Sequence, residues 1–134
     1  MTQSLSEIFI HIVFSTKNRD PLLKKDIRYE LFSYISQILK SLNSPSITIG
    51  GVEDHIHILC RLSKNFTVSK IVKDIKRNSS KWIKTRGILN FYWQNGYSVF
   101  SVSSSNLDKT INYILNQEQH HEKQENFAKQ TSIP

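Results

Sequence analysis

Two histidines separated by a single residue, His55 and His57, are the side chains of this sequence best spaced to do chemistry together. They lie in residues 51–60, a stretch that reads as a turn followed by a short buried strand. Successive side chains of a strand point to opposite faces, so both imidazoles would share one face, about 7 Å apart. Two imidazoles at that spacing can converge on one metal ion, while Cys60 falls on the opposite face and is not counted as a ligand.

A second candidate group lies near the C-terminus, where Tyr113 and Gln117 are four residues apart. The surrounding pattern predicts a helix with Asn106 as its N-cap and an apolar stripe on one side. The members of that stripe are Leu107, Ile111, Ile114 and Leu115. Tyr113 and Gln117 lie off the stripe and could present both groups to one point. Alternatively, Tyr113 packs at the edge of a core and Gln117 is solvated.

These residues together suit the cleavage of a phosphodiester. A tyrosine hydroxyl can attack phosphorus, but its pKa of about 10 makes it a weak nucleophile without help. A divalent metal on the scissile phosphate would supply that help, and His55, His57 and the Gln117 carbonyl oxygen form a sensible set of three ligands. By itself the histidine pair is not decisive, because two histidines at this spacing also occur by chance on exposed strands.

Length and composition restrict the class of protein. The chain has 134 residues, which predicts one domain, with a polar, frayed tail after about residue 124. One cysteine excludes a disulfide framework and suits a reducing cytoplasm. No apolar run approaches the ~20 residues of a membrane span, and no signal peptide is visible. The net charge of +7 favours a polyanionic partner such as nucleic acid.

A strongly basic helix is predicted between Thr67, its N-cap, and Gly87, its C′ residue. Seven basic residues in it would neutralise phosphates: Lys70, Lys73, Lys76, Arg77, Lys81, Lys84 and Arg86. An ordinary solvated face is the alternative, but Asp74 is the only acidic residue among them. Downstream, Tyr92, Trp93 and Tyr97 could stack on unpaired bases, although Trp93 could equally belong to the core.

The remaining pattern predicts an α+β fold. Strands are expected at residues 7–16, 46–49, 55–60 and 97–102, with Gly50–Gly51 as a bend between the middle two. A helix with Asp20 as its N-cap and Pro21 as its first residue runs to about Leu42. This order predicts a ferredoxin-like βαββαβ antiparallel sheet with two helices on one face, plus a C-terminal helix carrying Tyr113. His11, His55 and His57 would face out of the open side.

Four separated segments resemble one known family. Residues 54–59, Asp-His-Ile-His-Ile-Leu, resemble the histidine–hydrophobic–histidine motif of HUH nucleases. Residues 113–117 resemble the tyrosine helix of single-tyrosine HUH transposases, the TnpA type encoded by the smallest bacterial insertion sequences. Residues 11–17 and 93–97 resemble the first strand of that family and the segment before its last strand. REP-associated tyrosine transposases are close relatives of the same family.

The resemblance implies a transposase that cleaves and rejoins single-stranded DNA at the hairpin ends of a mobile element. Tyr113 would form a 5′-phosphotyrosine link, and His55, His57 and Gln117 would hold Mg²⁺ or Mn²⁺. Imidazoles are poor ligands for hard Mg²⁺, which favours Mn²⁺, and His120–His121 could compete for the metal. The family implies a homodimer in which the tyrosine helix serves the partner's histidines.

Two other functions remain open at this point. A non-catalytic module that binds single-stranded nucleic acid could use the same scaffold, with the open sheet face and the basic helix as its surface. It would need neither metal nor a tyrosine hydroxyl. A metal hydrolase that activates water would leave Tyr113 idle.

Overall fold

The structure is a computed structural model that describes residues 7–119. The strands are β1 (Phe9–Ser15), β2 (Ser46–Gly51), β3 (His55–Arg61) and β4 (Ser98–Val102). The helices are α1 (Lys25–Ser41), α2 (Val68–Thr85) and α3 (Leu107–Leu115), with short 3-10 turns at Lys17–Arg19 and Ser104–Asn106. Within residues 7–119, no helix is both long and apolar enough to cross a lipid bilayer.

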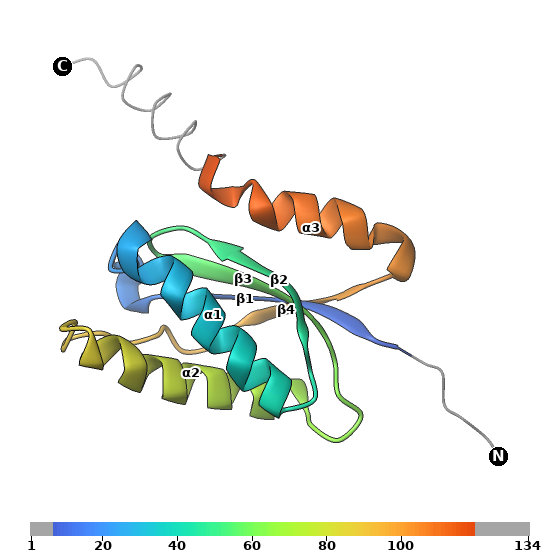
Figure 1. Ribbon diagram of the computed structural model, residues 1–134, viewed down its shortest axis with the longest axis horizontal. Helices are drawn as coiled ribbons and strands as arrows, with labels where there is room; N and C mark the ends of the chain where they lie inside the picture. Colours follow the sequence, from blue (N-terminus) through green and yellow to red (C-terminus); the bar gives the residue numbers. More distant parts are fainter. Residues whose placement is uncertain (1–6, 120–134) are drawn as a thin grey trace.

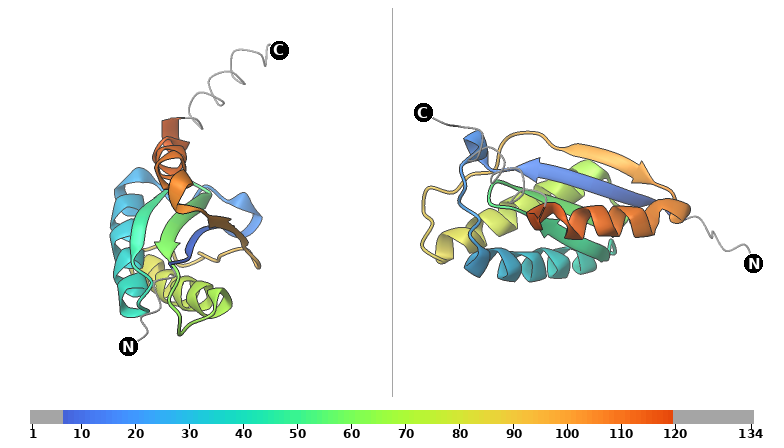
Figure 2. Two further views of the ribbon diagram at one scale, coloured as in Figure 1. Left: turned by 90° about the vertical axis from the view of Figure 1, so that its right-hand side faces the viewer. Right: turned by 90° about the horizontal axis from the view of Figure 1, so that it is seen from above.

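The four strands form one antiparallel sheet in the order β2-β3-β1-β4. Helices α1 and α2 cover one face, and α3 crosses the other (Figure 1 and Figure 2). This confirms the expected ferredoxin-like α+β fold. The hairpin of β2 and β3 brings the histidine strand into the interior of the sheet, next to β1.

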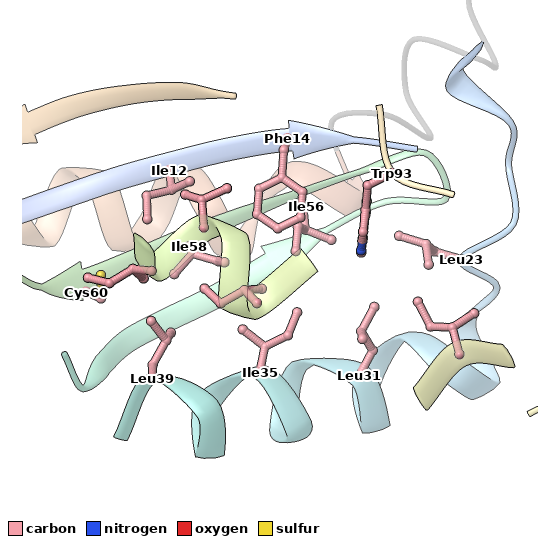
Figure 3. Close-up of a cluster of buried hydrophobic side chains, with 14 of the residues drawn as sticks. Ile12, Phe14, Leu23, Leu31, Ile35, Leu39, Ile56, Ile58, Cys60 and Trp93 are labelled. Atoms are coloured by element: carbon pink, nitrogen blue, oxygen red, sulfur yellow. The ribbon is translucent and has the colours of Figure 1, made fainter. Parts of the chain in front are cut away.

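The core lies between the sheet and its two helices. Burial alternates along β1, which sends Ile10, Ile12 and Phe14 inward, and β3 contributes Ile56, Ile58 and Cys60 to the same layer (Figure 3). Burial raises the pKa of the Cys60 thiol to about 12, so this cysteine is a neutral core residue. Its predicted position away from the histidine face is confirmed.

The predicted start of the first helix is wrong. Helix α1 begins at Lys25 with Lys24 at the N-cap position, and Asp20–Pro21 precede it. The backbone amide of Leu23 donates to the Glu53 carbonyl oxygen at 2.9 Å, and the Leu23 side chain is fully buried. This hydrogen bond to the β2–β3 turn and the burial of Leu23 hold the segment before Lys25 in a non-helical conformation. They override the helix start that the Asp-Pro sequence predicts.

The predicted bend at Gly50 and Gly51 is also wrong, because strand β2 continues through both residues. The turn follows them, with the Val52 amide donating to the His55 carbonyl oxygen. A Cβ on Gly50 would lie 2.7 Å from the carbonyl oxygen of Ile114 in α3. Glycine is therefore required here for the close approach of a helix rather than for a turn.

Candidate active site

Helix α3 is fixed to the chain at two points. Ile114 is buried against Gly50 of β2, and further along the chain Glu118 receives a hydrogen bond from Tyr29 and ion pairs from Lys25 and Arg28. Burial raises the pKa of Glu118, but the bonds from these three α1 residues outweigh it and leave the pKa lowered.

The helix departs from the predicted pattern in two details. Leu115, expected on the buried stripe, is 59% exposed, so the prediction is wrong for that residue. Asn106 does precede α3 as expected, but its side chain makes no capping bond and donates to Ser103 Oγ. The buried face of α3 therefore centres on Ile114.

The open sheet face and α3 bring the predicted catalytic and metal-binding residues together. His55, His57, Tyr113 and Gln117 all line one open pocket of about 410 Å³. The His55 and His57 rings are 5.1 Å apart between centroids, and the Tyr113 ring is 5.7 Å from that of His57, edge to face. Tyr113 is 56% exposed, which leaves it accessible to a large substrate, whereas Gln117 is buried.

His55 is oriented by an acidic neighbour. Asp54 Oδ1 lies 2.8 Å from His55 Nδ1, and Asp54 Oδ2 accepts a bond from Arg19 at 3.2 Å. Burial raises the pKa of Asp54, but the hydrogen bond from His55 and the Arg19 charge outweigh it and leave the pKa lowered. An ionised carboxylate only accepts, so the proton of His55 lies on Nδ1 and its Nε2 is left as the ring atom available for a ligand.

His57 is more deeply buried and faces another histidine. Its Nδ1 is 2.8 Å from Nε2 of His11 on β1. Burial, with the neighbouring charges of His55 and His11, lowers the pKa of His57 to about 3, so the ring is neutral near pH 7. Among residues 7–119, the buried His57 Nε2 has no hydrogen-bond partner.

The donor set at the pocket suits a divalent cation. The His57 Nε2 is an orphaned buried nitrogen, and neutral imidazole is the form that ligates a metal. Gln117 donates its amide nitrogen to the Tyr113 carbonyl at 3.2 Å, which leaves its carbonyl oxygen as the candidate ligand. In the described part of the chain, no cluster of three His, Cys, Asp or Glu side chains is placed to hold a metal. His120 and His121 lie outside the described residues.

A loop before β4 forms another wall of the pocket. Residues 94–97 of the loop line it, and the Lys76 ammonium holds this loop by donating to the carbonyl oxygens of Gln94 and Gly96, both at 2.7 Å. Burial lowers the pKa of Lys76. That Lys76 binds phosphate stays a prediction, and in this structure its ammonium contacts the pocket loop.

The other predicted DNA-binding residues lie on α2, except Arg86, which is its C-cap residue. Helix α2 covers the face of the sheet opposite α3 (Figure 1). Lys73 and Lys81 are exposed, Lys70 and Arg77 pair with Asp74, and Lys84 lies over the Tyr92 ring. Arg86 pairs with Glu30. The structure therefore separates this basic surface from the four pocket residues.

The aromatic segment divides between core and surface. Trp93 packs against Phe14 and Phe91, and its Nε1 donates to Ser79 Oγ at 3.0 Å, so it is a core residue. Tyr92 and Tyr97 are 56% and 40% exposed and remain able to stack on a base.

A family model described as "Transposase IS200 like" matches residues 4–117. The chain belongs to this family. The fold is similar to that of a candidate transposase of Deinococcus radiodurans R1, with 19% identity, a TM-score of 0.70 and coverage of 88% of this chain and 98% of that one. It is also similar to a REP-associated tyrosine transposase bound to a REP hairpin, with 15% identity, a TM-score of 0.66 and coverage of 90% and 74%. A comparison with curated proteins finds no match.

Membership of the IS200-like transposases supports a role as a DNA-processing enzyme in transposition. His11, Asp54 and Lys76 are additional pocket-supporting residues whose roles the sequence did not reveal. Strand alternation put His11 on the correct face, but its bond to His57 depends on the pairing of β1 with β3.

Proposed function

We propose that this protein cleaves and rejoins single-stranded DNA at the ends of a mobile element through a covalent 5′-phosphotyrosine intermediate. The observation that carries the proposal is that His55 and His57 of β3, Tyr113 of α3 and Gln117 just after α3 line one pocket, although β3 and α3 are far apart in sequence. A binding module has no use for a tyrosine hydroxyl beside two histidines, and a hydrolase that activates water leaves Tyr113 without a role.

In the proposed reaction, Tyr113 Oη attacks the phosphorus of a phosphodiester held in the pocket. A bond forms between Oη and phosphorus, and the bond between phosphorus and the 3′ oxygen breaks. The phenolic proton is lost, and the departing 3′ oxygen takes up a proton to become a hydroxyl. Rejoining reverses these steps, because a 3′ hydroxyl attacks the phosphotyrosine and releases the phenol, with no need for ATP.

His55 Nε2, His57 Nε2 and the Gln117 carbonyl oxygen would hold Mg²⁺ or Mn²⁺. The bound cation would polarise the scissile phosphate and stabilise the charge that develops on it. The protein's own contribution is to keep the His57 ring neutral through burial and to orient the His55 ring through its bond to Asp54. The exposed Tyr113 ring stands beside them, and α3 is held by its contacts to Gly50 and α1.

The substrate would be DNA with a hairpin near the cleavage point. The related REP-associated enzyme is bound to a REP hairpin, and this chain offers a basic α2 surface of its own. Lys73 and Lys81 are exposed on that surface and would contact phosphates without regard to sequence.

The active form is proposed to be a homodimer with sites shared between chains. The described chain by itself already brings Tyr113 to its own His57, so shared sites require α3 to dock on the partner in the same manner. Mixing the inactive variants Tyr113→Phe and His57→Ala under subunit exchange tests this. Shared sites restore part of the cleavage in the heterodimer, whereas self-contained sites restore none.

The central test uses labelled single-stranded DNA carrying a hairpin end, incubated with and without Mn²⁺ and separated on a denaturing gel. The expected result is a metal-dependent covalent adduct in the wild type that is absent from Tyr113→Phe. That variant keeps the ring and removes only the hydroxyl, so it should still bind the DNA. An adduct of undiminished yield in Tyr113→Phe would exclude Tyr113 as the nucleophile.

A further inference from the structure

His11 of β1 lies outside the set of residues assigned above, yet it touches the proposed metal site directly. We propose that His11 is a positioning residue that fixes His57 in the tautomer whose bare Nε2 faces the pocket. This inference deepens the proposed function and rests on it for the role of His57 as a metal ligand. The assignment comes from the geometry of the two rings and their surroundings.

The two rings meet through defined atoms. His11 Nε2 lies 2.8 Å from His57 Nδ1, and the ring centroids are 5.1 Å apart. The register of the strands creates this contact, because Val13 pairs with His57 while His11, two residues earlier on β1, shares its face of the sheet. With Nδ1 committed to His11, Nε2 is the only ring nitrogen of His57 left for a ligand. In the described part of the chain, that buried atom has no partner.

One proton is shared across the contact, and its position sets both tautomers. The two facing nitrogens are 2.8 Å apart, so one of them donates and the other accepts. If His57 Nδ1–H donates to His11, His57 Nε2 keeps a free lone pair and can bind a cation. If His11 donates instead, the proton of His57 moves to Nε2. That arrangement excludes a metal and leaves a buried N–H without an acceptor among residues 7–119.

His11 is itself held in place by three elements. Its backbone belongs to β1, its ring packs against Phe100 of β4 with centroids 5.9 Å apart, and it meets Tyr113 of α3 edge-on at 6.1 Å. These neighbours keep its Nε2 directed at His57. His11 therefore serves His57 as Asp54 serves His55, so that each histidine presents Nε2 to the pocket through a different partner on Nδ1.

The tautomer can be read directly in the metal-free protein. In protein labelled with ¹⁵N at histidine, long-range ¹H–¹⁵N correlation at pH 7.5 identifies the protonated nitrogen of His57, assigned by its loss in His57→Gln. We expect Nδ1 to carry the proton in the wild type. In His11→Phe, which keeps a ring but has no acceptor, the proton should redistribute toward Nε2. In His11→Gln, whose amide oxygen can accept, it should return to Nδ1.

Metal affinity supplies the second readout. Calorimetric titration with Mn²⁺ in the absence of DNA should show affinity about 10- to 100-fold weaker in His11→Phe. Recovery to within a few-fold is expected in His11→Gln. A purely structural role for His11 would lower the melting temperature of both variants without moving the His57 proton.

The inference is overturned if His57 of the wild type carries its proton on Nε2, a result that needs no variant to fold. It is also overturned if His11→Phe is folded, keeps the Nδ1 proton and binds Mn²⁺ within twofold of the wild type. The tautomer measurement uses neither metal nor DNA, so it still succeeds in a protein that fails to cleave DNA. Failure of this inference and failure of the proposed function are therefore distinguishable.

Discussion

Gly50→Ala is expected to slow DNA cleavage without unfolding the protein. The new Cβ would lie 2.7 Å from the Ile114 carbonyl oxygen and 2.8 Å from Ile114 Cγ2. Ordinary contact begins near 3.4 Å, so α3 has to move away from β2 by about 0.7 Å. Tyr113 precedes Ile114 on this helix and would move with it. Misplacement by about 1 Å can reduce a rate about 100-fold, so a 10- to 100-fold loss is expected.

The assay is single-turnover cleavage of a labelled hairpin substrate at saturating DNA and Mn²⁺, so that weaker binding does not affect the rate. Urea denaturation should show a loss of about 1–3 kcal/mol in unfolding free energy, as for other overpacked contacts. Thr48→Val is the matched control, because it lies half-buried on the same strand and changes volume little. It should cleave at nearly the wild-type rate.

Cleavage by folded Gly50→Ala at a rate within twofold of the wild type would refute this reasoning. It would mean that the active enzyme does not deliver its tyrosine from a helix docked on Gly50.

Three further predictions follow from individual residues. In metal-free protein, the folded-state pKa of His57 of about 3 lies below its unfolded value of 6.5, so stability falls as pH drops through this range. The fall contributed by this residue is up to about 1.4 kcal/mol per pH unit. Urea titrations of His57→Gln should therefore show a weaker dependence on pH between 7 and 5, and an unchanged dependence would contradict burial of a neutral ring. Lys73→Met should reduce the slope of log affinity for single-stranded DNA against log salt concentration by ~0.7 for each phosphate that it no longer neutralises. Its cleavage rate at saturating DNA should be preserved. Lys76→Met should give the opposite pattern, with slower cleavage at saturating DNA and an unchanged salt slope, because it releases the loop at Gln94 and Gly96. Equal effects of the two variants would mean that both lysines contact DNA phosphates.

Most of the fold prediction rested on the alternation of side chains between the two faces of each strand. The isoleucines of β1 and β3 alternate with His11, His55 and His57, so their spacing separates the face that joins the core from the face that carries the histidines. The spacing of Tyr113 and Gln117, four residues apart, is likewise a pattern that can be read from a short stretch of sequence. Their meeting with the histidines follows once the C-terminal helix lies over the open face.

The errors arose where distant contacts overrode local signals. Asp20–Pro21 is a strong helix start, but the bond between the Leu23 amide and the Glu53 carbonyl keeps this segment non-helical. Gly50–Gly51 reads as a bend, whereas Gly50 makes room for a helix 64 positions further along the chain. The bonds from Lys76 to the Gln94 and Gly96 carbonyl oxygens were not predicted, because these partners lie on a loop whose path the helix pattern does not contain.

The neutrality of the proposed ligands has a thermodynamic consequence. Imidazole and amide ligands bring no negative charge of their own, so a divalent cation held by His55, His57 and Gln117 would not be neutralised by its ligands in this partly buried pocket. Such a charge is costly to bury until an anion joins it. A DNA phosphate would be that anion, so DNA should tighten the binding of the metal. Linkage then requires the metal to tighten the binding of DNA by the same factor, which makes cation and substrate each other's cooperative ligand.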